Sequence, residues 1–174
     1  MEVINLFAGP GAGKSTTAAG LFHEMKCRGI NVELVTEYAK DMTWEGRENI
    51  LGDQLYMLAK QNRRLERLKN QVEWVITDSP LLLCINYVKD DYLPGVFGKL
   101  VAKLFGSYCN NNIFIDRVKP YNPTGRSQSI EQAKKLDQKI LSSLDSLKVD
   151  YTIVRGDQGA TKTILEHLEI CGKI

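Results

Sequence analysis

The sequence predicts an α/β fold, in which a parallel sheet of five strands lies between two layers of helices. Two observations predict it. Short apolar runs alternate with stretches of helical periodicity along all 174 residues. Polar residues suited to chemistry also fall directly after the apolar runs, at the edge of a parallel sheet where ligands bind. We expect residues 1–174 to form a single domain.

The predicted strands are short apolar runs bounded by polar or glycine-containing turns. The first run ends in a glycine-rich turn, and a helical pattern follows at once. Each later run is likewise followed by a polar segment. The five runs are residues 3–7, 31–35, 72–77, 112–115 and 151–154.

The predicted helices have apolar residues at three- and four-residue spacing. Gly29 ends the first of them. Ser129 and Gln132 have the spacing of a capping box at the start of another. One or two helices are expected where Pro94 and Gly95 interrupt the pattern. The predicted helical segments are residues 14–28, 45–70, 91–108, 129–147 and 161–170.

Composition and charge exclude several classes of protein. Hydrophobic residues make up 43% of the chain and charged residues 25%, which is typical of a globular domain. The net charge of +2 is too small to indicate nucleic-acid binding by bulk charge. The longest apolar run, residues 81–85, is too short to cross a membrane.

Four cysteines without a CxxC pair, and two histidines, argue against a zinc site. We expect reduced thiols, with Cys84 buried, in a cytoplasmic protein that is a monomer or homodimer.

The stretch AGPGAGKST, residues 8–16, matches the phosphate-binding loop GxxxxGK[ST] except that Ala8 replaces the first glycine. Backbone N–H groups of such a loop point at phosphate oxygens, and the dipole of the following helix adds to the attraction. Lys14 is expected to reach the β- and γ-phosphates, and Thr16 the α-phosphate. The residues expected to contact ATP here are Gly9, Gly11, Ala12, Gly13, Lys14, Ser15 and Thr16.

A carboxylate after a neighbouring strand would complete a metal site. Asp78 follows the apolar run in VEWVITDSP and is positioned to help Ser15 hold Mg²⁺. The predicted cofactors are therefore ATP and Mg²⁺.

Other features favour a kinase over a switch or a motor. The chain has no NKxD-like motif for guanine. An AAA-type or helicase motor would be longer and would carry further sensor motifs. The polar segment after the fourth predicted strand, about residues 117–129, is expected to form a lid. Its Arg117 and Arg126 would stabilise charge on the transferring phosphoryl group and help exclude water.

Four segments together resemble the small P-loop kinases found in phages: AGPGAGKST, VTEYAKD, VITDSP and DRVKPYNPTGRSQSIEQA. These are similar to the kinase domain of ribosylnicotinamide kinases and, more distantly, to deoxynucleoside and nucleoside-monophosphate kinases. The resemblance implies the three-layer P-loop NTPase sandwich with a lid, and phosphoryl transfer from ATP with Mg²⁺. It also implies that Glu37 contacts the acceptor hydroxyl and can act as the base.

Further residues are candidates for binding the two substrates. Tyr38 could stack on an aromatic ring of the acceptor, as could Trp44, and Gln54 could read a base edge; core packing is the alternative for the two aromatic residues. The turn containing Asp157 and Gly159 would lie against adenine, or it is an ordinary tight turn.

The prediction is an ATP- and Mg²⁺-dependent kinase that acts on a nucleoside, a nucleotide or a related small acceptor. A second hypothesis is a kinase for DNA or for a modified base, with nucleic acid as the acceptor. A third is an ATPase switch that transfers phosphate only to water. Basic residues that hint at the second are Arg63, Arg64, Arg67, Lys69, Lys99 and Lys103.

Overall fold

A computed structural model describes residues 1–89, 92–122 and 129–174. Five parallel strands form one sheet in the order β2-β3-β1-β4-β5, which confirms the predicted fold class. Each strand lies within three residues of its predicted bounds at either end. The strands are β1 (Glu2–Phe7), β2 (Val32–Val35), β3 (Trp74–Thr77), β4 (Cys109–Asp116) and β5 (Thr152–Arg155).

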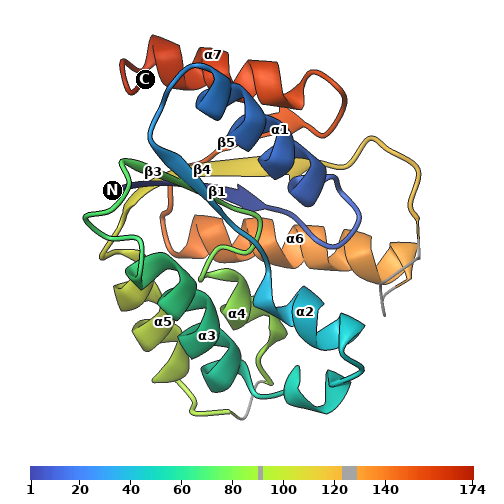
Figure 1. The fold of residues 1–174 in the computed structure, drawn as a ribbon. Helices are drawn as coiled ribbons and strands as arrows, with labels where there is room; N and C mark the ends of the chain where they lie inside the picture. The colour runs from blue at the N-terminus through green and yellow to red at the C-terminus, as the bar shows by residue number, and fades with distance from the viewer. Residues whose placement is uncertain (90–91, 123–128) are drawn as a thin grey trace.

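Helices cover both faces of the sheet (Figure 1). On one face, α1 and α7 pack over a cluster that includes Ile4, Leu21 and Ile164. On the other face, α3, α5 and α6 pack over a cluster that includes Phe7, Leu58 and Ile140. The helices are α1 (Lys14–Cys27), α2 (Tyr38–Trp44), α3 (Gln54–Glu66), α4 (Leu83–Tyr87), α5 (Phe97–Phe105), α6 (Ile130–Ser146) and α7 (Ala160–Ile170), with a 3₁₀ turn η1 (Glu48–Ile50).

The sheet order puts β1 at the centre, with β3 on one side and β4 on the other. Residues 3–7 of β1 are all buried, as expected of a strand covered by helices on both faces. The loop after β1 therefore lies at the middle of the carboxyl edge. The segments after β2, β3 and β4 flank it, and this arrangement brings the site together.

The predicted helix over residues 45–70 is wrong in its first third. A separate helix, α2, ends instead at residue 44, and the chain turns at Gly46, whose φ of 68° favours glycine. The next long helix begins only at Gln54. The Asp53 side chain caps it by accepting a hydrogen bond from the backbone N–H of Tyr56.

The structure also differs from the prediction around β4. Of the segment predicted as one or two helices over residues 91–108, helix α5 occupies nine residues. The short helix α4 was not predicted, because five residues are too few for helical periodicity to show. β4 begins at Cys109 rather than at 112. There the side chain of Asn5 donates hydrogen bonds to Asn110 and Asn112, so polar residues can form the first part of this interior strand.

Two smaller predictions concern helix ends and thiols. The capping box of Ser129 and Gln132 is confirmed at the start of α6. The four cysteines are free, and Cys84 is half-buried rather than buried. Within the described ranges, no helix is both long and apolar enough to span a bilayer.

The cap of α3 gives a test of this local structure. Replacing Asp53 with Ala removes the acceptor for the N–H of Tyr56 and should lower the free energy of unfolding by about 1 kcal/mol. Asp53→Ser keeps an acceptor and should retain most of the stability. Urea denaturation of both variants measures the difference, and equal losses in the two would contradict the capping role.

Candidate functional site

The loop between β1 and α1 has the geometry of a phosphate cradle. Gly13 caps α1 with a left-handed backbone at φ 110°, which disfavours a side chain at this position. Lys14 folds back over the loop, and its Nζ donates hydrogen bonds to the carbonyls of Ala8 at 2.8 Å and Gly9 at 3.2 Å. The ammonium is thereby held at the concave side of the loop, at the N-terminus of a helix, where an anion would bind.

Burial lowers the pKa of Lys14, while attraction from the carboxylates of Glu37, Asp78 and Asp137 opposes that change. Three acidic side chains from three different segments therefore lie close enough to act on this one ammonium. They come from the end of β2, the end of β3 and the middle of α6.

Asp78, directly after β3, faces the start of α1. The hydroxyl of Ser15 donates a hydrogen bond to Asp78 Oδ2 at 2.5 Å. Asp78 is only 3% exposed, and its Oδ1 has no hydrogen-bond partner among the described residues. A buried carboxylate oxygen without a partner is costly, and a divalent cation would satisfy it. The pair therefore fits a Mg²⁺ site of the predicted kind.

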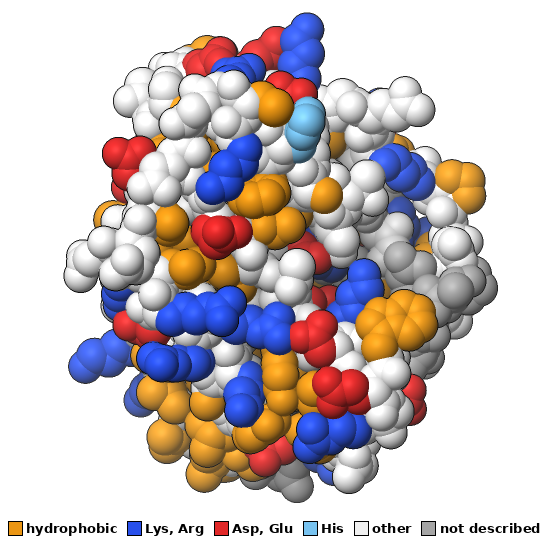
Figure 2. All heavy atoms as spheres, viewed as in Figure 1, with side chains coloured by type: hydrophobic (Ala, Val, Ile, Leu, Met, Phe, Trp, Pro, Cys, Tyr) orange, Lys and Arg blue, Asp and Glu red, His pale blue; other side chains and the backbone are white. Residues whose placement is uncertain are grey.

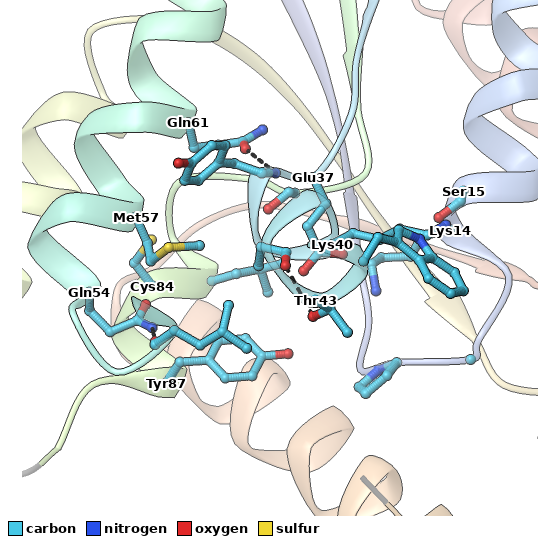
Figure 3. Close-up of a pocket in the computed structure, with 18 of the residues that line it drawn as sticks. Lys14, Ser15, Glu37, Lys40, Thr43, Gln54, Met57, Gln61, Cys84 and Tyr87 are labelled. Carbon is cyan, nitrogen blue, oxygen red and sulfur yellow. Dashed lines mark hydrogen bonds between the residues drawn. The ribbon is translucent and has the colours of Figure 1, made fainter. Parts of the chain in front are cut away.

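Glu37 lies between the end of β2 and the first residue of α2. It lines the same cavity as Lys14 and Ser15 (Figure 3). Burial raises the pKa of this carboxyl group, while Lys14 acts in the opposite direction. A carboxylate with a raised pKa at the mouth of a phosphate loop is suited to accept a proton near neutral pH.

The cavity extends from the phosphate loop toward α2, α3 and α4 and has a volume of about 510 Å³. That volume is within the range of sites for small molecules. Its inner wall combines apolar side chains with a few polar groups, as Figure 3 shows. The wall includes Lys40, Thr43, Leu51, Gln54, Met57, Gln61, Leu83, Cys84 and Tyr87.

The candidate acceptor-binding residues occupy different positions in this cavity. Gln54 is buried in its wall, and its side-chain amide donates to the carbonyl of Leu51 at 2.7 Å. Tyr38 is half-buried at the rim, against the ring of Tyr56. Trp44 is not a core residue, since it is 65% exposed while lining the cavity.

Gln61 is a residue that sequence reasoning missed. Its Oε1 accepts a hydrogen bond from the backbone N–H of Tyr38 at 3.0 Å, and its Nε2 donates to the carbonyl of Thr36 at 3.3 Å. These bonds fix the backbone on both sides of Glu37. Gln61 lies seven residues after Gln54, a spacing that places both amides on one face of α3. This spacing was the signal in the sequence that could have identified Gln61.

Asp137 is the second missed residue, and it ties α6 to the phosphate loop. Its Oδ1 accepts a hydrogen bond from the N–H of Gly9 at 2.5 Å, and its Oδ2 accepts one from Arg117 Nε at 2.9 Å. It shares the buried face of α6 with Ala133 and Ile140. A carboxylate on an otherwise apolar face was the signal in the sequence.

Arg117 follows β4, and its side chain lies against the phosphate loop. Its side chain is 8% exposed, and its two terminal nitrogens have no hydrogen-bond partner among the described residues. A Cβ placed on Gly9 or on Gly11 would lie 3.4 Å from one of those nitrogens. The guanidinium therefore presents unused donors beside the phosphate cradle.

The remaining predicted residues fall in two loops. Arg126 and the rest of residues 123–128 of the expected lid lie outside the described residues. Of that segment, the ring of Tyr121 packs over Gly11, where a Cβ would approach it to 2.8 Å. Asp157 accepts a hydrogen bond from the N–H of Gly159 at 2.8 Å, so its carboxylate stabilises its own turn. That turn contacts the phosphate loop through Gly156, where an added Cβ would lie 2.5 Å from the carbonyl of Ala12.

Comparison with known proteins supports the P-loop fold. Residues 3–160 match the model of a family described as an AAA domain, and the chain belongs to this family. The structure resembles shikimate kinase from Aquifex aeolicus vf5, with a TM-score of 0.55 and 19% sequence identity over 98% of each chain. At this identity the likeness shows a shared fold. No curated protein sequence gives a significant match.

The pair of Asp137 and Arg117 can be tested by a double-mutant cycle. Asp137→Asn leaves a buried guanidinium without its counter-charge and should lower the free energy of unfolding by about 3 kcal/mol. Adding Arg117→Met to that variant should cost less than it does in the wild type, because the unpaired charge is removed with it. Urea denaturation of the four proteins gives the coupling, and additive losses would show that the pair does not interact.

Proposed function

We propose that this member of the AAA domain family is a phosphotransferase that uses ATP and Mg²⁺ to phosphorylate a hydroxyl of a nucleoside-like acceptor. One observation carries the proposal. A single cavity is lined by the phosphate loop through Lys14 and Ser15 and also by the carboxyl group of Glu37. ATP and the acceptor would therefore bind in the same cavity, on either side of the Glu37 carboxylate, which can accept a proton.

On the donor side, the backbone N–H groups of the loop and the Lys14 ammonium would bind the β- and γ-phosphates. Ser15 and Asp78 would hold Mg²⁺, which supplies positive charge against the phosphate oxygens. The terminal nitrogens of Arg117, which have no hydrogen-bond partner among the described residues, would then meet charge that develops on the transferring phosphoryl group.

On the acceptor side, Glu37 would accept the proton of the acceptor hydroxyl. The acceptor oxygen then forms a bond to the γ-phosphorus as the bond from that phosphorus to the bridging oxygen breaks. ADP leaves with the bond electrons. The fixed backbone around Glu37, held by Gln61, would keep the carboxylate aligned with the hydroxyl.

A nucleotide switch that transfers phosphate only to water remains the competing function. The cavity favours a kinase, because it extends beyond the phosphate loop to α2, α3 and α4, whereas attack by a water molecule needs no such space. The cavity wall combines apolar side chains with a few polar groups, and this lining also favours an acceptor with a planar ring.

The direct test is a transfer assay with ATP labelled in its γ-phosphate. The acceptors are nucleosides, nucleoside monophosphates, nicotinamide riboside and DNA, each with Mg²⁺ present. We expect label to appear in at least one organic acceptor. Label found only as free phosphate across the panel would refute the kinase function and favour the switch.

Glu37 provides a second prediction. Glu37→Gln removes the base and should lower kcat roughly 10²-fold or more. Glu45→Gln, a matched change at the exposed end of α2, should leave kcat close to that of the wild type.

The pH dependence of kcat follows from the raised pKa of Glu37. Activity should fall as the pH drops through that pKa, because a protonated carboxyl group cannot accept the hydroxyl proton. The acidic limb should therefore lie above the ordinary value of 4.5 and should be missing from the residual activity of Glu37→Gln. A limb that persists unchanged in this variant would assign it to another group.

A further inference from the structure

We infer that the acceptor is presented to the cavity at the end of a single-stranded nucleic acid, whose phosphates lie along a row of cations on α3. This inference rests on the proposed function, since it names the form in which that site receives its acceptor. The row consists of Lys60, Arg64 and Arg67 and is called the basic row below.

The basic row occupies one face of α3 and its C-cap, because its members are spaced by four and three residues. Lys60 and Arg67 are exposed, and neither takes part in an ion pair within the described part of the chain. Figure 2 shows Lys and Arg side chains gathered over the region of α3 on the face in view. The row therefore carries positive charge that local carboxylates leave largely uncompensated.

Aromatic rings hold two of these cations, Lys60 and Arg64, in place. Lys60 Nζ lies 5.2 Å from the ring centroid of Tyr56 and 6.0 Å from that of Tyr38. Arg64 Cζ lies 5.1 Å from the ring centroid of Tyr38, and Arg64 also pairs with Asp41. Cation–π contacts of this kind restrict long side chains, so less entropy is lost when a ligand binds.

The row leads to the mouth of the cavity. Arg64 donates a hydrogen bond to the carbonyl of Thr36 at 3.0 Å, one residue before Glu37. Tyr38 and Trp44 both line the cavity, and the indole of Trp44 is largely exposed there. The cavity rim thus offers an exposed indole and, where Arg64 lies against Tyr38, a cation. Proteins bind single-stranded nucleic acids through this combination of base stacking and phosphate pairing.

The volume of the cavity and the charges of the basic row together indicate the form of the ligand. A cavity of about 510 Å³ can take one nucleoside-sized group, whereas the basic row lies outside it. A free nucleoside has no phosphates for the row to bind. A paired base would first have to leave its stack, which a single strand avoids.

Among the described residues, cations on the opposite face of the sheet, on α1 and α7, have different partners. There Lys162 on α7 pairs with Glu166, and Arg28 pairs with Glu169. Lys26 on α1 also lies over a ring, that of Phe22, which makes it a matched partner for the Lys60 contact. These residues supply a control of equal charge change.

The test measures binding of a fluorescent single-stranded oligothymidine by anisotropy at several salt concentrations. The proteins are the wild type, Lys60→Gln/Arg67→Gln, Trp44→Ala, and the control Lys26→Gln/Lys162→Gln, each first checked by thermal unfolding. We expect salt-dependent binding by the wild type and the control. The basic-row variant should bind more weakly, and the slope of log K against log salt should be smaller by about 1.4, since each single-strand phosphate contact contributes about 0.7.

Trp44→Ala separates stacking from charge. It should weaken binding about tenfold and leave the salt slope unchanged, because stacking involves no counterion release. Absence of binding by the wild type at low salt, or equal losses in the basic-row variant and the control, would overturn the inference. Equal competition by polyglutamate would point to an acidic protein partner and would also overturn it.

The proposed kinase function is tested separately from nucleic-acid binding. Transfer of label to a free nucleoside without any oligonucleotide binding refutes the inference and leaves the kinase intact. Oligonucleotide binding with the expected slope, but with label released only as free phosphate, refutes the kinase. The basic-row variant should keep the wild-type rate on a free nucleoside and lose rate on an oligonucleotide.

Discussion

The phosphate loop depends on the two hydrogen bonds that the carboxylate of Asp137 accepts. One oxygen fixes the backbone of the phosphate loop at Gly9, and the other orients the guanidinium of Arg117. Because Asp137 lies on α6, this helix, the loop after β1 and the segment after β4 are held to a common point. A cradle that must bind phosphate without rearranging needs such a fixed contact, since every group that reorders on binding reduces the affinity.

Around that point, charges of both signs are enclosed together. The carboxylates of Glu37, Asp78 and Asp137 all act on the ammonium of Lys14, and the nearby charge of Arg117 opposes them. Enclosed in this way, the charges interact more strongly than they would in water, so the pKa values of Lys14 and Glu37 depend on their neighbours. A bound triphosphate would add negative charge, and its metal ion positive charge. The metal ion would be a partner for Asp78 Oδ1, and the phosphates would be partners for the terminal nitrogens of Arg117.

The sequence signals of the phosphate loop are easily recognised because they are local. A glycine-rich loop between an apolar run and a helix, and an aspartate after another run, need only short stretches of chain to be recognised. Asp137 and Gln61 escaped notice because their partners are 128 and 23 to 25 residues away in the sequence. Contacts of that kind depend on how helices are placed over the sheet, which periodicity does not determine.

The cavity wall away from the phosphate loop is where the prediction of local structure failed, and there is a physical reason. It is built from α2, η1, α3 and α4, of which three are seven residues or shorter. Helices this short have little intrinsic stability, and tertiary contacts hold them in place. In this chain those contacts include the side-chain amide of Gln61, which accepts a hydrogen bond from the backbone N–H of Tyr38 at the start of α2. A wall assembled in this way can change its lining with few consequences for the sheet, whereas the phosphate cradle is fixed to the sheet and to α6. If the proposed function holds, the segment between β2 and β4 would select the acceptor, and the loops around β1 would supply the phosphate-binding chemistry.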